Sequence, residues 1–235
     1  MDPLDNPVWS SLTGRQSYLA LRKGHALRYA PEYNVFAATP DTSPESLADL
    51  GELVRVHGFV GVLDGRPLPP VPGATVVSDA GGQQWLAPDT PPPAHGFEVV
   101  DLTDEDGGEM LALATLTEPG PFFARTHQLG AFIGVKQDGR LAAMAGERMR
   151  PDGYTEISGV CTHPDFRGQG YGATLTMEAA ARIRARGDIP FLHVYAANTP
   201  AIALYKALGF TLRREFVMTV LAPEGAAAAS VPGHG

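Results

Sequence analysis

The residues best suited to bind a charged ligand lie between Glu156 and Gly172. An apolar stretch ends at His163-Pro164, and an alanine-rich helical pattern begins soon afterwards. The turn between them consists of Arg167, Gly168, Gln169, Gly170, Tyr171 and Gly172. A glycine-rich turn that opens a helix directs free backbone N–H groups toward one point, and the helix dipole adds partial positive charge. Since Arg167 adds a full charge with forked donors, the segment predicts a phosphate or pyrophosphate site.

Two other phosphate-binding patterns fit this turn less well. Gly168-x-Gly170-x-x-Ala173 satisfies the minimal dinucleotide fingerprint, and Asp188 follows at about twenty residues. However, residues 162–167 separate the strand from the turn, and Asp188 precedes the next strand instead of ending it. A Walker loop is excluded because no Gly-Lys-Ser/Thr is present. A plain glycine-rich turn without a ligand is the structural alternative.

Apolar periodicity and turn residues predict the elements that position this turn. Strands are expected at 97–102, 131–135, 140–150, 154–162, 189–196, 210–212 and 215–221. Helices are expected from the acidic cap at 103–106 to Thr117, from the glycine turn to about Arg186, and from Thr199 to Gly209. This order predicts an α/β (α+β) fold with a mixed, mostly antiparallel central sheet and helices on both faces.

A proline-rich segment, residues 88–96, divides the chain. We expect a smaller N-terminal α/β domain over residues 1–87 and the main domain over 97–222. In the first part the pattern predicts a helix at 44–56 with Ser43 as its N-cap and a strand at 58–63, but no chemical motif. Residues 223–235 are small and alanine-rich, which predicts a disordered tail.

Composition limits the classes of partner. Hydrophobic residues make up 44% of the 235 residues, which suffices for a packed core, and the net charge of −8 argues against nucleic acid. The single cysteine, Cys161, excludes an internal disulfide and a cysteine-based zinc site. The sequence begins without a secretion signal and holds no membrane-span pattern, so we expect a cytoplasmic protein with no membrane partner.

Two blocks together resemble a known superfamily. Arg167-x-x-Gly170-x-Gly172, between a strand and a helix, is similar to the pyrophosphate motif of the GNAT superfamily of acyl-CoA-dependent N-acyltransferases. A second family block places an Asn after a strand, a Tyr on the following helix, and then Gly-Phe; here these are Asn198, Tyr205 and Gly209-Phe210. The resemblance covers about residues 97–221. It looks closest to the glycine-N-acyltransferase-like branch, in some of which the N-terminal region is a degenerate copy of the fold, an idea that extends to residues 1–87.

The resemblance implies transfer of an acetyl group from acetyl-CoA to a primary amine, on a small molecule or a peptide N-terminus. The amine would attack the thioester directly and no metal would take part. A non-catalytic acyl-CoA sensor or scaffold is the alternative function. The N-terminal part would either cover the cleft or mediate a homodimer, and both roles stay open. Neither the acceptor nor the acyl chain length follows from the sequence.

The resemblance also implies roles for individual residues. The backbone N–H groups of residues 167–172 would hold the CoA pyrophosphate. Val160, Cys161 and Thr162 would pair with the pantetheine arm, and an N–H near Val160 would stabilise the oxyanion. Asn198 would bond the cofactor backbone. Tyr205 would contact the cofactor and protonate the leaving thiolate.

The base that removes the amine proton has several candidates: Glu156, Glu147 and His193. We favour Glu156, because strand alternation places it on the same face as Ser158 and Val160. His193 lies mid-strand between apolar neighbours, as a satisfied core histidine does. A covalent mechanism through Cys161 is disfavoured, since no base stands beside it in sequence.

Overall fold

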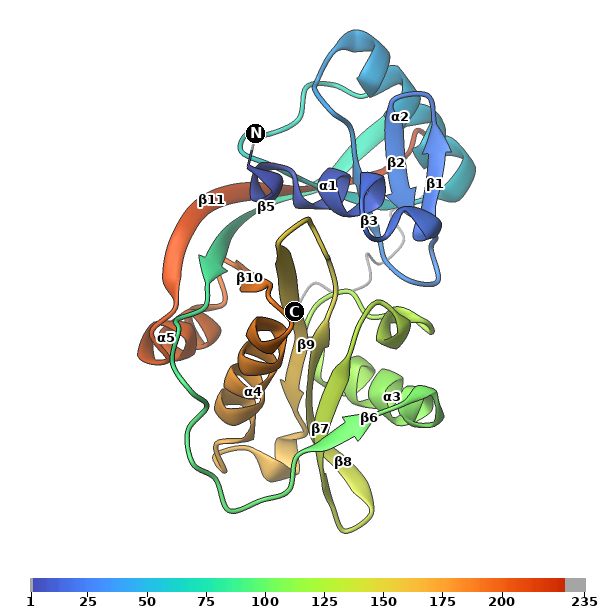
Figure 1. Cartoon of the computed structure of the whole chain (residues 1–235). Helices are drawn as coiled ribbons and strands as arrows, with labels where there is room; N and C mark the ends of the chain where they lie inside the picture. The colour runs from blue at the N-terminus through green and yellow to red at the C-terminus, as the bar shows by residue number, and fades with distance from the viewer. Residues whose placement is uncertain (1, 227–235) are drawn as a thin grey trace.

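The computed structural model describes residues 2–226, whose strands form one sheet in the order β1-β2-β3-β4-β11-β5-β10-β9-β8-β7-β6 (Figure 1). β3 pairs with β4, and β9 with β10, in parallel, and the other neighbours pair antiparallel. The predicted mixed, mostly antiparallel sheet is therefore confirmed. The strands are β1 (Ala20–Lys23), β2 (Ala26–Tyr29), β3 (Phe36–Ala38), β4 (Val60–Asp64), β5 (Ala74–Leu86), β6 (Val100–Leu102), β7 (Phe132–Gln137), β8 (Arg140–Glu147), β9 (Tyr154–Thr162), β10 (Ile189–Tyr195) and β11 (Thr211–Pro223).

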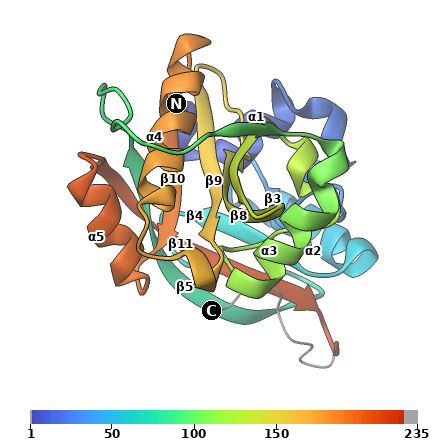
Figure 2. The same cartoon turned by 90° about the horizontal axis from the view of Figure 1, so that it is seen from below.

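Helices cover both faces of this sheet, as expected. They are α1 (Pro7–Thr13), α2 (Pro44–His57), α3 (Gly107–Thr117), α4 (Tyr171–Ala185) and α5 (Thr199–Ala207). Figure 2 shows α3 and α4 on opposite sides of β8 and β9. Ala145 of β8 belongs to the apolar core beneath α4, while its neighbour Met144 belongs to the core beneath α3. No helix within residues 2–226 has both the length and the apolarity to cross a bilayer.

Local sequence signals predicted several C-terminal elements at or near their observed positions. β9 has the predicted bounds. Thr103 and Asp106 form a reciprocal capping box at the short 3-10 turn (Asp104–Asp106) that leads into α3. Asp138 and Gly139 have φ values of 52° and 74°, the left-handed geometry of a tight hairpin turn between β7 and β8. In the N-terminal part, the Ser43 hydroxyl accepts a hydrogen bond from the Ser46 N–H, as expected of the α2 N-cap.

β5 was not predicted, and it joins the two parts of the molecule. Its 13 residues pair along their whole length with β11, and Gly82–Leu86 also pair with β10. Figure 1 shows these long strands passing between the N-terminal elements and the rest of the fold. The strands predicted at 210–212 and 215–221 form one strand, β11, with a register shift between Leu212 and Arg214.

The predicted domain boundary remains a prediction. Residues 88–96 hold neither helix nor strand, which suits a connecting segment. The sheet nevertheless continues from β4 through β11 and β5 into β10. Of the predicted disordered tail, Pro223 ends β11 and residues 227–235 lie outside the described part of the chain.

A bulge interrupts β9 and corrects one prediction. The register against β8 shifts between Met144 and Gly146, and Gly159 has a φ of 63°. Ile157 and Val160 consequently contact the same core beneath α4, although they are an odd number of positions apart in the strand. The expectation that Val160 shares a face with Glu156 and Ser158 is wrong, because the bulge adds a residue and reverses the alternation beyond it.

β9 and β10 separate beyond a short paired region. They pair at Tyr154–Glu156, and no strand is paired with the β10-facing side of β9 from Ile157 to Thr162 among the described residues. β10 continues alongside β5 instead. The sheet therefore opens at this point and exposes backbone groups of β9 beside α4 and α5.

Candidate active site

A pocket of about 130 Å³ occupies the opening between β9 and β10. Its walls come from Ile157–Val160 of β9, His193–Tyr195 of β10, the N-terminus and inner face of α5, and the loop 119–121 after α3. Phe36 of β3 and Leu63 of β4 complete it from the N-terminal part of the chain. Both halves of the molecule therefore build one site.

The glycine turn forms an exposed cradle at the start of α4. Gly168 and Gly170 have φ values of 80° and 82°, which L side chains rarely adopt, and Gly170 is the N-cap residue. The first intrahelical bond runs from the Thr174 N–H to the Gly170 carbonyl, so the preceding N–H groups at the helix start remain available. The first turn of α4 contains no acidic residue.

The side chains of this turn are of two kinds: one is exposed to solvent, and the others contact neighbouring residues. Arg167 is exposed and has no ion-pair partner within the described chain. The buried Tyr171 donates its hydroxyl to Gln169 Oε1 at 2.8 Å and packs edge-on against Phe97. Arg167 is thus open to a ligand, whereas Tyr171 and Gln169 support the turn.

Tyr205 and Asn198 both line the pocket from α5. Tyr205 is 9% exposed, and burial raises the pKa of its phenol to about 12, so the phenol keeps its proton at neutral pH. Asn198 is the N-cap of α5, where its Oδ1 accepts from the Ala201 N–H at 3.2 Å. This bond leaves the Asn198 amide group as a donor.

Glu156 lies behind the pocket in a buried ion pair. Its side chain is fully buried, and its two oxygens accept from Arg148 Nη2 at 2.6 Å and Arg148 Nε at 2.8 Å. His193 Nδ1 lies 2.7 Å from Glu156 Oε1. Burial alone would raise the pKa of this carboxyl, but the Arg148 charge and the bonds from Arg148 and His193 outweigh it and hold the pKa at about 2.

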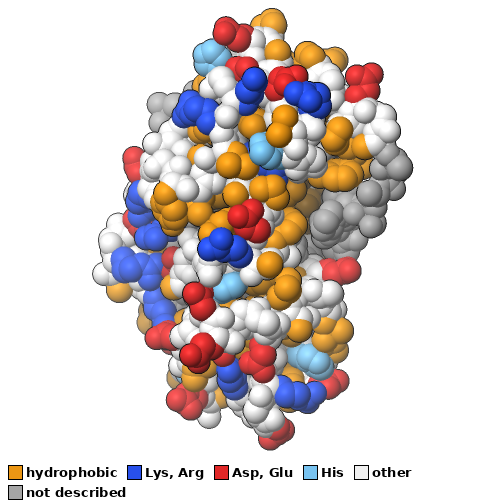
Figure 3. Space-filling view, turned by 90° about the vertical axis from the view of Figure 1, so that its right-hand side faces the viewer, with side chains coloured by type: hydrophobic (Ala, Val, Ile, Leu, Met, Phe, Trp, Pro, Cys, Tyr) orange, Lys and Arg blue, Asp and Glu red, His pale blue; other side chains and the backbone are white. Residues whose placement is uncertain are grey.

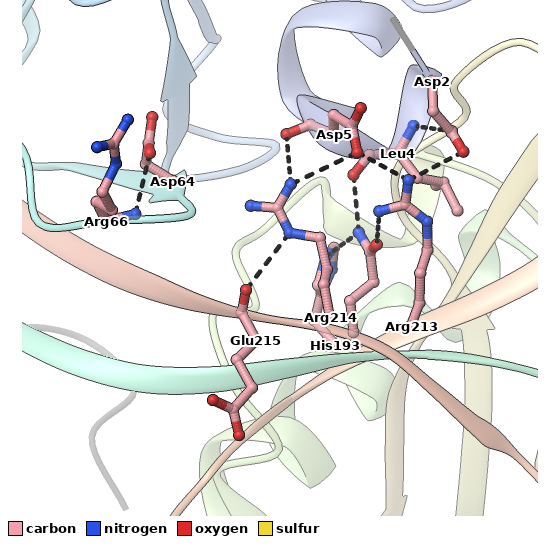
Figure 4. A network of polar contacts seen from close by, with 10 residues as sticks. Asp2, Leu4, Asp5, Asp64, Arg66, His193, Arg213, Arg214 and Glu215 are labelled. Carbon is pink, nitrogen blue, oxygen red and sulfur yellow. Dashed lines mark hydrogen bonds and ion pairs between the residues drawn. The ribbon is translucent and has the colours of Figure 1, made fainter.

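The network continues from His193 to the surface (Figure 4). Gln84 Nε2 donates to the Leu4 carbonyl and lies 3.0 Å from His193 Nε2, while Gln84 Oε1 accepts from Arg213. Arg213 is in turn held by Asp2 and Asp5. Since Arg213 fixes which end of the Gln84 amide faces His193, Nε2 of His193 accepts and Nδ1 donates to Glu156.

His193 is therefore the satisfied histidine that its apolar neighbours predicted, with both ring nitrogens occupied. Its side chain is 7% exposed, yet it lines the pocket. Glu147, another candidate base, is buried in an ion pair with Arg186 and does not line the pocket.

The residues predicted along β9 lie in different environments. Val160 lines the pocket at the bulge, and Thr162 is half-buried at the end of the strand. Cys161 lies in the core beneath α3, where burial raises the pKa of its thiol to about 12. A thiol that stays protonated in an apolar core is a poor nucleophile.

Sequence reasoning missed the residues that come from distant strands. Arg148, Gln84 and Phe36 carry no local motif, since each gains its role from a tertiary contact: Arg148 with Glu156 on the next strand, Gln84 with His193, and Phe36 with Arg148. Phe216 and Met218 of β11 also line the pocket. Their apolar stretch predicted a strand, but not the cavity that the strand faces.

The outer surface shows no stripe of one charge on the face in Figure 3. Acidic and basic side chains are interspersed there, with apolar side chains gathered toward the middle. Together with the net charge of −8, this distribution gives no support for a nucleic-acid partner.

Comparison with known proteins finds a family model that matches this sequence and a solved structure with the same fold. Residues 132–218 match the family model of the FR47-like protein. A solved acetyltransferase of the GNAT family from Novosphingobium aromaticivorans DSM 12444 is 44% identical, covers 95% of this chain and all of its own, and superposes with a TM-score of 0.87.

Two groups of curated relatives match in the C-terminal part. The [ribosomal protein bS18]-alanine N-acetyltransferase of Salmonella typhimurium is 31% identical over 115 residues, which are 47% of this chain and 77% of that enzyme. The mycothiol acetyltransferase of Thermomonospora curvata is 37% identical over 83 residues, 35% of this chain. The match spans only 28% of the length of that enzyme. On this likeness in sequence and fold, the chain belongs to the GNAT family of acetyltransferases and contains an FR47-like domain.

Proposed function

We propose that the protein transfers an acetyl group from acetyl-CoA to a primary amine by direct attack. The observation that carries the proposal is the opening between β9 and β10, which joins the anion cradle of α4 to a pocket containing Tyr205. The proposal does not depend on membership of the glycine-N-acyltransferase-like branch.

Three parts of the chain would hold acetyl-CoA. The N–H groups at residues 167–172 and the Arg167 side chain suit the pyrophosphate. The unpaired side of β9, at Val160, Cys161 and Thr162, suits the amides of the pantetheine arm as an added strand would. Asn198 adds its amide donor from the opposite wall.

Thioester cleavage requires a hydrogen-bond donor to the carbonyl oxygen and a proton for the leaving thiolate. The bulge takes Val160 out of register with β8 and turns this residue into the pocket, so its backbone N–H is our candidate for the oxyanion. Tyr205 supplies the proton, since its raised pKa keeps the phenol protonated until the thiolate forms.

The amine proton raises a separate question. Glu156 is a poor candidate to accept it, because a carboxylate with a pKa of about 2 is a weak base at neutral pH. We propose that Glu156 instead holds Arg148 and His193 in place, and that the acceptor enters as the uncharged amine. The proton that the nitrogen loses on forming the amide returns to the Tyr205 phenolate, so the products are the neutral amide and the CoA thiol. Both Glu156 oxygens and both His193 nitrogens are already occupied, which supports this role.

Glu156→Gln separates these roles. If Glu156 removes the proton, the loss of kcat should be largest for alkylamines and nearly absent for an acceptor that is already uncharged at the assay pH, such as an aryl hydrazine. If Glu156 positions its neighbours, both acceptors should lose activity alike. Unfolding curves of the variant show whether the fold survives the change.

The names of the relatives indicate which classes of acceptor to test. Their names describe acetylation of a ribosomal protein alanine in one case and of the mycothiol system in the other. We propose a small molecule or a peptide N-terminus for this chain.

Calorimetric titration with acetyl-CoA, with NAD as control, tests the donor site, and thiol release with an amine panel tests catalysis. Binding of acetyl-CoA without NAD, together with amine-dependent thiol release, is the expected result. Binding without turnover on any amine would favour the non-catalytic sensor.

A further inference from the structure

The end of the pocket away from the glycine cradle has apolar walls from distant strands. Phe36 of β3, Leu63 of β4, and Phe216 and Met218 of β11 contribute to it. Phe36, Phe216 and Met218 are at most 8% exposed and belong to one apolar core. These side chains line the same pocket as Tyr205, so they are placed to contact an acceptor that enters it.

Charge in this pocket is already balanced. Arg148 is the one charged residue among the described residues that line it, and its guanidinium pairs with Glu156 through two hydrogen bonds. The guanidinium also lies 4.9 Å from the centre of the Phe36 ring. No aspartate or glutamate lines the pocket within residues 2–226.

These observations restrict the acceptor. An ammonium group that enters this pocket loses much of its hydration, and no unpaired carboxylate is present among the described lining residues to compensate. An apolar body instead gains from contact with Phe36, Leu63 and Met218. We infer that the acceptor is a primary amine with an apolar body and no second cationic group. This inference rests on the proposed function and narrows its substrate class.

A matched pair of acceptors tests the inference. Hexylamine and 1,6-diaminohexane have the same chain, and the diamine carries a second ammonium group at neutral pH. We expect kcat/KM for hexylamine to exceed that for the diamine by about tenfold or more, measured as CoA thiol release at a fixed acetyl-CoA concentration. Equal values, or a preference for the diamine, would overturn the inference while leaving the acetyltransferase function intact.

A charge placed in the pocket wall should weaken or remove the preference for hexylamine. Leu63 is half-buried at the pocket, so Leu63→Glu introduces a carboxylate with less cost than a change in the core. We expect it to raise the ratio of diamine to hexylamine turnover by about tenfold. Leu63→Gln, of matched size without the charge, should leave the preference for hexylamine in place.

The experiments distinguish a failure of the proposed function from a failure of the acceptor inference alone. If acetyl-CoA binds but no amine of the panel releases thiol, the proposed function fails, and the acceptor inference fails with it. If other amines release thiol but neither hexylamine nor the diamine does, the acceptor inference alone fails. If thiol release proceeds and Leu63→Glu and Leu63→Gln change the ratio equally, wall charge does not select the acceptor and the inference alone fails. Circular dichroism and thermal unfolding confirm that both variants are folded before the comparison.

Discussion

At the scale of single residues, Tyr205 has the environment of a proton donor. Its phenol is buried, has a pKa raised to about 12, and lies in the pocket. We expect Tyr205→Phe to lower kcat by about 100-fold or more, because the thiolate loses its acid. Acetyl-CoA affinity should hold, since the pyrophosphate cradle is elsewhere. Steady-state thiol release and calorimetry measure the two effects, with Tyr154→Phe as the control outside the pocket. Unchanged kcat would remove Tyr205 from the reaction.

Arg167 is the exposed cation of the glycine turn. Arg167→Glu should weaken acetyl-CoA binding by about 1.5 to 3 kcal/mol, on the order of 10-fold to 150-fold in Kd, because a charge-assisted bond becomes a repulsion. Calorimetric titration measures the Kd. Arg66→Glu makes the same charge change in an exposed loop after β4 and should leave affinity unchanged. Equal affinity in both variants would contradict the pyrophosphate assignment.

Glu156 links the site to stability. Its pKa falls from 4.5 to about 2 on folding, so the ionised form contributes stability above pH 4.5 that is lost as pH falls toward 2. Glu156→Gln should lower the free energy of unfolding at pH 7 by about 3 to 5 kcal/mol, because it leaves Arg148 buried without its partner. It should also weaken the dependence of the free energy of unfolding on pH between about 4.5 and 2. Urea unfolding at several pH values measures both, and Glu52→Gln, which removes a surface ion pair with Arg55 on α2, should change both far less.

At the scale of elements, the β9 bulge turns Val160 into the pocket. Gly159 has a φ of 63°, and an added Cβ would lie 3.3 Å from Phe132. Gly159→Val should cost about 1 to 3 kcal/mol of stability and strongly reduce turnover, since relief of the strain would remove the bulge. Thermal unfolding and thiol release measure these effects. Gly108→Ala in α3, which has open space and ordinary backbone, should instead stabilise slightly. A fully active Gly159→Val enzyme would separate the bulge from catalysis.

At the scale of the whole molecule, the sheet and Arg15 tie the two parts together. Arg15 pairs with Asp188 at 2.8 Å and donates to the carbonyls of Arg150 and Pro151. We expect one cooperative unfolding transition for the whole chain, because β5 and β11 run through both parts. Arg15→Met should lower the stability by about 1.5 to 3 kcal/mol without splitting that transition, whereas exposed Arg22→Met should have little effect. Two separate transitions in the wild type would support independent domains at the proline-rich boundary.

The sequence alone determined the features that depend on neighbours along the chain. The glycine turn, the α4 start, the Thr103 cap, the Asp138-Gly139 hairpin and the bounds of β9 follow from local backbone preferences. Short-range steric and hydrogen-bonding rules suffice for such features. Tyr205 and Asn198 were identified from the resemblance of their sequence block to the GNAT superfamily, and α5 carries both.

Only the tertiary structure decided what surrounds them. The hydrophobic pattern of β5 is interrupted by glycines and polar residues, so its place between β10 and β11 required the partner strands. The buried carboxylate of Glu156 looked like a base until Arg148 and His193 were beside it. The walls at Phe36 and Met218 come from β3 and β11, which are remote in the sequence but have only β4 between them in the sheet. Long-range pairing sets burial and charge balance, and these quantities decide whether a side chain is reactive or structural.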